Sequence, residues 1–102
     1  MASAFTGNAT WYTPDGGYGA CDTIPLQDSD NIVALSNSQY AGGAHCGRFI
    51  TVFYEGKSVD VAIRDLCPGC GSNEIKLSSP AFQQLAGLDV GRILQVTWVY
   101  AD

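Results

Sequence analysis

The sequence predicts a small, mainly β domain: a closed barrel of about six short strands with one or two short helices. Apolar residues gather in short runs rich in β-branched and aromatic side chains, and glycine-rich turns separate these runs. Only one segment has helical periodicity. The chain has 102 residues, 46% of them apolar and 15% charged, so we expect residues 1–102 to form a single domain.

The first half of the chain contains two expected strands. Residues 9–12 read as a short strand, and the run TPDGGYGAC that follows excludes regular structure. The apolar run IVAL at residues 32–35 is typical of a buried strand. Residues 36–47, SNSQYAGGAHCG, are expected to form a loop.

The clearest local signal is a β-hairpin at residues 48–65. Its arms, RFITVFY and SVDVAIRD, flank the turn EGK and are rich in strand-forming residues. In the second arm Val59, Val61 and Ile63 share one face. Continued alternation places Asp65 on the same core-facing side, at the end of the strand.

A strand and a helix are expected after the hairpin. In EIKL, residues 74–77, the two aliphatic residues face inward and Lys76 faces outward. Ser79 is predicted to cap a helix that begins at Pro80 and ends at Gly87.

The final strand, RILQVTWVY, occupies residues 92–100. Strict alternation predicts one apolar stripe along it, and Trp98 is expected in the core. The stripe comprises Leu94, Val96, Trp98 and Tyr100.

The charge pattern limits the classes of partner. Ten acidic and five basic side chains give a formal charge of -5, without blocks of like charge. We therefore expect neither nucleic acid nor a membrane as partner. We also expect a monomer in solution. The first three residues lack the pattern of a signal peptide, so a secreted protein would here be in its mature form behind an added initiator Met.

Four cysteines in so short a chain indicate disulfides and an oxidising, extracellular environment. Zinc is the alternative, but only Cys67 and Cys70 form a CxxC pair, while Cys21 and Cys46 stand alone. A redox motif is disfavoured because Gly71 follows where a helix should begin. No metal or cofactor is expected, and four cysteines allow three pairings.

Seven short motifs follow one another in an order that resembles a known family. They are GNATWY, GACD, ALSNSQY, HCGRFITV, VAIRDLCPGC, IKLSSPAFQQLA and VTWVY. The set resembles the double-psi β-barrel module of expansins, and among them the single-domain fungal proteins called loosenins, from about residue 5 to residue 100. The resemblance implies a secreted six-stranded double-psi β-barrel with a shallow polysaccharide-binding groove, without the carbohydrate-binding second domain of full expansins.

The resemblance also implies a function. Expansins and loosenins loosen cellulose-rich or chitin-rich cell-wall material without substantial hydrolysis. The same barrel serves glycoside hydrolases, peptidoglycan lytic transglycosylases and inhibitors of papain-type proteases, so fold does not decide function. The alternative is therefore a cysteine-protease inhibitor or another partner-binding module, and a lytic transglycosylase that uses Asp65 as acid and base in turn is a weaker one.

Three site residues are implied by position within these motifs. Thr10 takes the place of the family's groove threonine, and Asp65 that of its essential aspartate. Lys76 stands where expansins usually carry a second aspartate, and Cys67 where some bacterial members carry a groove tyrosine. Glycoside hydrolysis by the usual route needs two carboxylates, and an ammonium group cannot replace one, so hydrolytic activity is disfavoured.

Four aromatic residues are candidate sugar platforms. Trp11 and Tyr12 are adjacent in a strand, so one ring faces inward and the other outward, where it could stack on a sugar. Tyr18 and Tyr40 lie in predicted loops and are either platforms or ordinary loop packing.

The resemblance to barwin-type barrels implies a disulfide pairing. It favours Cys21 with Cys46, which leaves Cys67 with Cys70 across the Pro-Gly turn. On the chain-entropy model, the longer bridge would stabilise the fold by about 3 kcal/mol.

Overall fold

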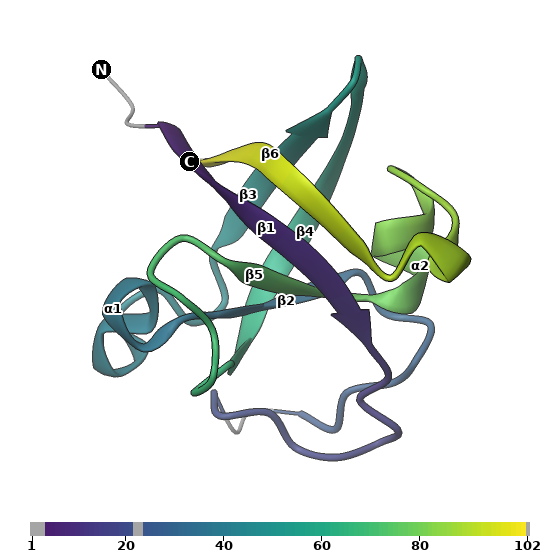
Figure 1. Cartoon of the computed structure of the whole chain (residues 1–102). Helices are drawn as coiled ribbons and strands as arrows, with labels where there is room; N and C mark the ends of the chain where they lie inside the picture. Colours follow the sequence, from purple (N-terminus) through teal and green to yellow (C-terminus); the bar gives the residue numbers. More distant parts are fainter. Residues whose placement is uncertain (1–3, 22–23, 102) are drawn as a thin grey trace.

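Six strands in the described part of the chain close into one barrel (Figure 1). The computed structural model describes residues 4–21 and 24–101. Around the barrel the strands follow the order β1, β5, β2, β4, β3, β6. Their bounds are Ala4–Tyr12 (β1), Ile32–Leu35 (β2), Phe49–Tyr54 (β3), Lys57–Leu66 (β4), Ile75–Ser78 (β5) and Arg92–Tyr100 (β6). The predicted six-stranded barrel is confirmed.

Two of the strand pairs are parallel, and the other pairs in the described barrel are antiparallel. β1 runs parallel to β5 and β2 runs parallel to β4, whereas β3 and β4 form the predicted hairpin. Glu55 and Gly56 at its turn have positive φ values of 48° and 78°, a combination that matches the twist of paired strands. β1 begins earlier than the predicted residue 9 because Ala4 to Gly7 pair with β6.

Short helices cover opposite sides of the barrel in Figure 1. They are α1 (Asn37–Tyr40), η1 (Ala41–Gly43), α2 (Ser79–Gln83) and η2 (Leu88–Val90). No helix within the described residues is long and apolar enough to cross a membrane.

Two predictions about these helices are wrong. The segment 36–47 is not only a loop, because Ser36 accepts a hydrogen bond from the backbone N–H of Gln39 and caps α1. α2 begins at Ser79 and ends at Gln83, short of Gly87, and its N-cap is Ser78 rather than Ser79. The Ser78 hydroxyl does not cap the helix, since it accepts a hydrogen bond from the backbone N–H of Ile32 at 3.1 Å.

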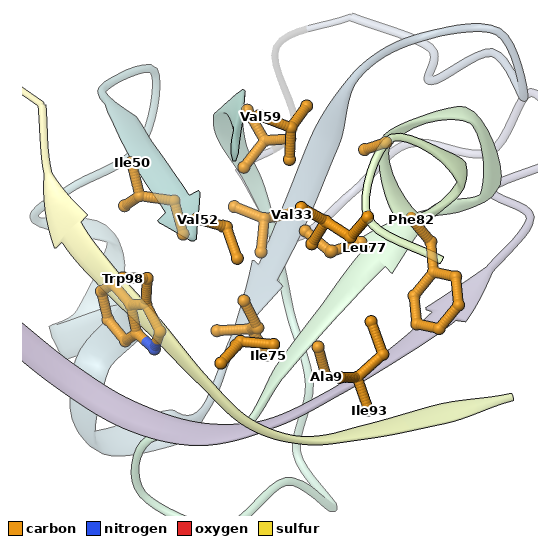
Figure 2. Close-up of a cluster of buried hydrophobic side chains, with 14 of the residues drawn as sticks. Ala9, Val33, Ile50, Val52, Val59, Ile75, Leu77, Phe82, Ile93 and Trp98 are labelled. Atoms are coloured by element: carbon orange, nitrogen blue, oxygen red, sulfur yellow. The ribbon is translucent and has the colours of Figure 1, made fainter. Parts of the chain in front are cut away.

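The core fills the barrel interior with aliphatic side chains and Trp98 (Figure 2). The alternate residues Val33 and Leu35 of β2 point inward. Trp98 is fully buried, and its indole N–H donates to the carbonyl oxygen of Asn73 at 3.0 Å. Phe5 stacks on it, with ring centroids 4.6 Å apart.

A β-bulge in β6 interrupts the predicted apolar stripe. Gly7 pairs with Val96 but Ala9 pairs with Ile93, so two residues of β6 oppose one of β1. Ile93 is 2% exposed, whereas Leu94 is 66% exposed. The prediction that Leu94 belongs to the stripe is therefore wrong, because the bulge shifts the alternation by one residue.

A candidate polysaccharide groove on the outer face of the barrel

Asp65 lies on the outer face of the barrel, near the end of β4. Val33 of β2 pairs with Ile63 and the next residue, Ala34, pairs with Asp65, so Arg64 is an extra residue in β4. Such a bulge reverses the alternation, and Asp65 takes the outer side of Ala34 instead of the core side of Ile63. The prediction that Asp65 continues the core-facing row is wrong.

Five strands contribute one residue each to a continuous row beneath the groove. Arg92 of β6 pairs with Thr10 of β1, and Thr10 pairs with Lys76 of β5. Lys76 then pairs with Ala34 of β2, and Ala34 with Asp65 of β4. All five residues line an open groove of about 490 Å³. The structure therefore brings together the three residues that the sequence motifs implied: Thr10, Asp65 and Lys76.

Three hydrogen-bond donors hold the carboxylate of Asp65. The Tyr12 hydroxyl donates to Oδ2 at 2.9 Å. The backbone N–H groups of Ala20 and Leu66 donate to Oδ1 at 2.9 Å and 2.8 Å. Donors from three segments of the chain thus fix the orientation of this group at one end of the row.

Tyr12 stays a hydrogen-bond donor over a wide pH range. Partial burial raises the pKa of its phenol well above the usual value, and the negative charge of Asp65 and their hydrogen bond raise the pKa further. Each cause disfavours the phenolate. The tyrosine therefore donates to Asp65 under all physiological conditions.

The glycine-rich loop after β1 packs directly on the bulge. A Cβ atom at Gly19 would lie 2.3 Å from the carbonyl oxygen of Arg64, so only glycine fits there. Two residues further on, the backbone N–H of Cys21 donates to the same oxygen at 3.3 Å. A disulfide joins Cys21 to Cys46 and ties this loop to the barrel.

A second disulfide closes the wall of the groove beside Asp65. It joins Cys67 to Cys70 across the Pro-Gly turn, and all four residues of the turn line the groove. The backbone N–H of Cys67 donates to the carbonyl oxygen of Leu35 at 2.7 Å, which continues the β2–β4 pairing. The pairing that the resemblance implied is confirmed for both disulfides.

The groove also contains two charged residues that the sequence interpretation missed, Glu74 and Arg92. Glu74 accepts a hydrogen bond from the backbone N–H of Gly71 at 3.0 Å, and its other oxygen lies 4.0 Å from Arg92. Glu74 precedes Lys76 by two positions, and strand periodicity places both side chains on one face. This spacing in the sequence could have predicted that Glu74 lies in the groove with Lys76.

The other candidate aromatic residues do not line the groove. The indole N–H of Trp11 donates to the carbonyl oxygen of Leu88 at 2.9 Å, and the ring packs against the core. Tyr40, at the end of α1, also packs against the core. Tyr18 is 64% exposed in the glycine-rich loop. The prediction that Trp11 and Tyr12 face opposite ways is confirmed.

Asp65 gives the groove a carboxylate of fixed orientation, and such a group can accept hydrogen bonds from hydroxyl groups. The second carboxylate, Glu74, is held by a backbone amide and lies near a guanidinium group. The usual glycosidase mechanism requires two carboxylates, one as acid and one as base or nucleophile. The contacts of Glu74 do not leave it free for either role.

Comparisons with known proteins agree with this fold. A family model described as "Lytic transglycolase" matches residues 4–98. The papain inhibitor of Streptomyces mobaraensis is 38% identical over 106 residues, which cover 98% of this chain and 73% of the inhibitor.

Two of the similar solved structures illustrate the match, and each covers 98% of this chain. The Streptomyces papain inhibitor has a TM-score of 0.86 and 36% identity, with 96% of its own chain covered. A mutant Clavibacter michiganensis expansin in complex with cellohexaose has a TM-score of 0.88 and 30% identity, with 51% of its chain covered. These similarities support the expansin-like barrel, and the finer assignment to fungal loosenins stays a proposal. With a family model that matches nearly its whole length, the chain belongs to the double-psi β-barrel family described as lytic transglycolase.

Proposed function

We propose that the protein is secreted, binds polysaccharide chains of the cellulose or chitin type in this groove, and loosens cell-wall material without hydrolysing it. The observation that carries the proposal is the fixed Asp65 carboxylate in an open groove beside Thr10. Sugar hydroxyl groups need such acceptors. The similar expansin structure that holds cellohexaose supports a sugar ligand.

The shape of the groove supports a chain-like ligand. Its floor crosses five strands and has the small side chain of Ala34 near its middle. A sugar ring can therefore approach the backbone between the taller side chains of Lys76 and Asp65. Neighbouring strands are about 4.8 Å apart, so these two positions are separated by about 10 Å.

The charges support binding over cleavage. Lys76 stands in the row where a second carboxylate would be needed, and Glu74 is engaged by Gly71 and Arg92. An ammonium group cannot act as the base or nucleophile of the usual glycosidase mechanism. Two disulfides favour an extracellular location, where polysaccharides of this type occur.

Pull-down on insoluble cellulose and chitin tests the proposal, with reducing-sugar release assayed in the same tubes. We expect the wild type to bind and to release no sugar, and Asp65→Ala to bind more weakly. Asp60→Ala is the matched control, because Asp60 is an exposed aspartate of the same strand that accepts one hydrogen bond from Thr51. Circular dichroism verifies that both variants are folded.

Two outcomes would contradict parts of the proposal. Sugar release that disappears in Asp65→Ala would show that the groove cleaves its ligand. Equal binding by Asp65→Ala and Asp60→Ala would remove the groove from the binding mechanism.

A second candidate function is inhibition of papain-type cysteine proteases. It is favoured by the match to the Streptomyces papain inhibitor, which covers 98% of this chain and 96% of the inhibitor's. Titration of papain with the wild type and Asp65→Ala separates the two functions. Inhibition that is equal in both proteins, without binding to either solid, would favour a protein-binding surface outside the groove.

A further inference from the structure

We propose that Lys76 makes the middle of the groove a subsite for a sugar that carries a negative charge. The groove would then prefer a polysaccharide with carboxylate or sulfate groups to its neutral counterpart. This inference rests on the proposed polysaccharide binding and names the chemical class of the ligand.

Three of the four charged side chains in the groove already have partners. Asp65 accepts hydrogen bonds from Tyr12 and two backbone amides. Glu74 and Arg92 lie 4.0 Å apart at the other end of the groove. Lys76 is different: within the described residues, its ammonium group has neither an ion pair nor a hydrogen bond.

No carboxylate pairs with Lys76 within the described residues. Its neighbours across the strands are Thr10 on one side and Ala34 on the other, and neither is charged. Glu74 lies two positions earlier on the same face, about 7 Å along the strand, and its carboxylate is already held by a backbone amide and lies near a guanidinium group. Asp65 lies two strands away, about 10 Å by strand spacing. Lys76 itself is half-buried. A cation in this position attracts an anionic group on a bound ligand.

The chemistry of the ammonium group selects an anionic ligand. Lysine offers three donors and no acceptor, and its hydrogen bonds to an ionised oxygen are stronger than those to a neutral hydroxyl. A sugar ring over Ala34 would exclude water from this contact, which strengthens it further. As a point charge, lysine accepts carboxylate and sulfate groups alike, because it does not require the planar geometry that arginine matches.

The rest of the groove favours a charged sugar over an acidic peptide. Asp65 is an anion with hydrogen-bond donors around it, and it repels a second carboxylate that comes close. A sugar that bears one acidic group and several hydroxyl groups satisfies both positions, with its acid at Lys76 and a hydroxyl at Asp65. The overall charge of -5 repels anionic polymers at a distance, so any preference must come from this local contact.

Isothermal titration with matched oligosaccharides tests the inference. The probes are cellohexaose, its C6-oxidised form with carboxylates, and its C6-sulfated form. We expect the wild type to bind the charged forms about threefold to tenfold more tightly than cellohexaose at low salt. High salt should reduce this ratio, because screening weakens a partly exposed contact.

Lysine-to-glutamine variants locate the effect. Lys76→Gln should bring the ratio of the charged and neutral affinities close to one. Lys57→Gln is the matched control: it makes the same change in net charge, but Lys57 is exposed at the start of β4 and does not line the groove. The ratio should be unchanged in Lys57→Gln.

Each other outcome overturns a defined part of the argument. Binding of cellohexaose without a preference for the charged forms, or a preference that survives in Lys76→Gln, rejects the charged subsite and leaves the proposed function intact. Absence of binding to all three sugars, together with absence of binding to insoluble cellulose and chitin, rejects both. Stronger Lys76-dependent binding of poly-glutamate than of the charged sugars would assign Lys76 to an acidic protein partner. A preference for only one of the two charged forms would contradict the step that the lysine accepts carboxylate and sulfate groups alike.

Discussion

Tyr12 and Asp65 form the central side-chain contact of the groove. The phenol donates to a carboxylate that two backbone amides also hold, so the Tyr12 proton is one of three that fix Asp65. Hydrogen bonds to charged groups contribute about 1.5 to 3 kcal/mol, and partial exposure of this site favours the lower end. The contact therefore matters for stability as well as for ligand binding.

Tyr12→Phe should change how stability depends on pH. The folded-state pKa of Tyr12 is raised above the unfolded value of about 10, so its contribution is fully present below about pH 10 and is lost as the pH rises through the folded pKa. In that range the wild type should lose up to about 1.4 kcal/mol per pH unit from this group, less where solvent screens the site. Urea unfolding at pH 8, 10 and 11 measures the difference between the two proteins.

Tyr18→Phe is the control, since Tyr18 is exposed in the loop after β1. A residual slope should remain in Tyr12→Phe because the pKa values of Tyr54 and Tyr100 are raised as well, with the same sign. If Tyr12→Phe and the wild type lose stability in parallel above pH 10, the hydrogen bond to Asp65 does not form in solution.

At the scale of elements, two bulges decide which side chains face out. The extra residue in β4 moves Asp65 into the groove, and the extra residue in β6 moves Leu94 into solvent. Backbone N–H groups of the loop after β1 hold the first bulge, because they donate to the carbonyl oxygen of Arg64 and to the carboxylate of Asp65. β2, β4 and the loop after β1 therefore meet at the bulge in β4, and their contacts there set the position of Asp65.

Gly19→Ala should separate the loop from this bulge. The new Cβ would lie 2.3 Å from the carbonyl oxygen of Arg64 and 2.8 Å from Leu26, so the loop must move. We expect a loss of about 1 to 3 kcal/mol in the free energy of unfolding, together with weaker sugar binding. Chemical denaturation measures the first, and titration with cellohexaose the second.

Gly71→Ala is the matched control for this prediction. A Cβ atom at Gly71 would have no neighbour within 4 Å among the described residues, and its backbone N–H would still donate to Glu74. Similar losses of stability in the two variants would mean that the close approach at Gly19 is not what fixes the loop.

The two disulfides should differ in their effects. The bridges span 25 and 3 residues, so on the chain-entropy model Cys21–Cys46 contributes about 3 kcal/mol and Cys67–Cys70 about half of that. Replacing Cys67 and Cys70 by serine should therefore cost about half as much stability as loss of the longer bridge but weaken ligand binding more, because their turn lines the groove. Urea unfolding and titration with cellohexaose compare this variant with the Cys21→Ser and Cys46→Ser pair. A larger effect of the longer bridge on both quantities would contradict the prediction.

At the scale of the whole molecule, the strand order creates the groove. Its floor takes residues from β6, β1, β5, β2 and β4, which are consecutive neighbours in the sheet although they are distant in the sequence. The β1–β6 pairing also joins Ala4 near one chain end to Val99 near the other. No segment of the chain could present this row by itself.

We expect the protein to be a monomer at micromolar concentration. Sedimentation equilibrium should give a mass near 10.8 kDa, and small-angle scattering a radius of gyration close to 12.1 Å, slightly larger with bound water. Phe49 and Phe53 are exposed on the outer face of β3, on either side of Thr51, and form an apolar surface that could associate. A concentration-dependent mass that Phe53→Ser abolishes would contradict the monomer and identify this surface as the interface.

The sequence by itself determined the elements of this protein. Strand periodicity, turn residues and a Ser-Pro helix start are local signals, and they predicted the β3–β4 hairpin, the position of β2 and the existence of α2. Motif order supplied the barrel type, the disulfide pairing and the roles expected of Thr10, Asp65 and Lys76. Alternation could also have placed Glu74 beside Lys76, had both been read as members of one face.

Only the tertiary structure decided which residues share the groove. Alternation assumes uninterrupted pairing, whereas the bulges at Arg64 and Gln95 arise from pairing between distant strands. The same pairing places Arg92 beside Thr10 and sets Lys76 two strands from Asp65. Strand register depends on contacts between segments that are far apart in the chain, and for that reason a local pattern cannot specify it.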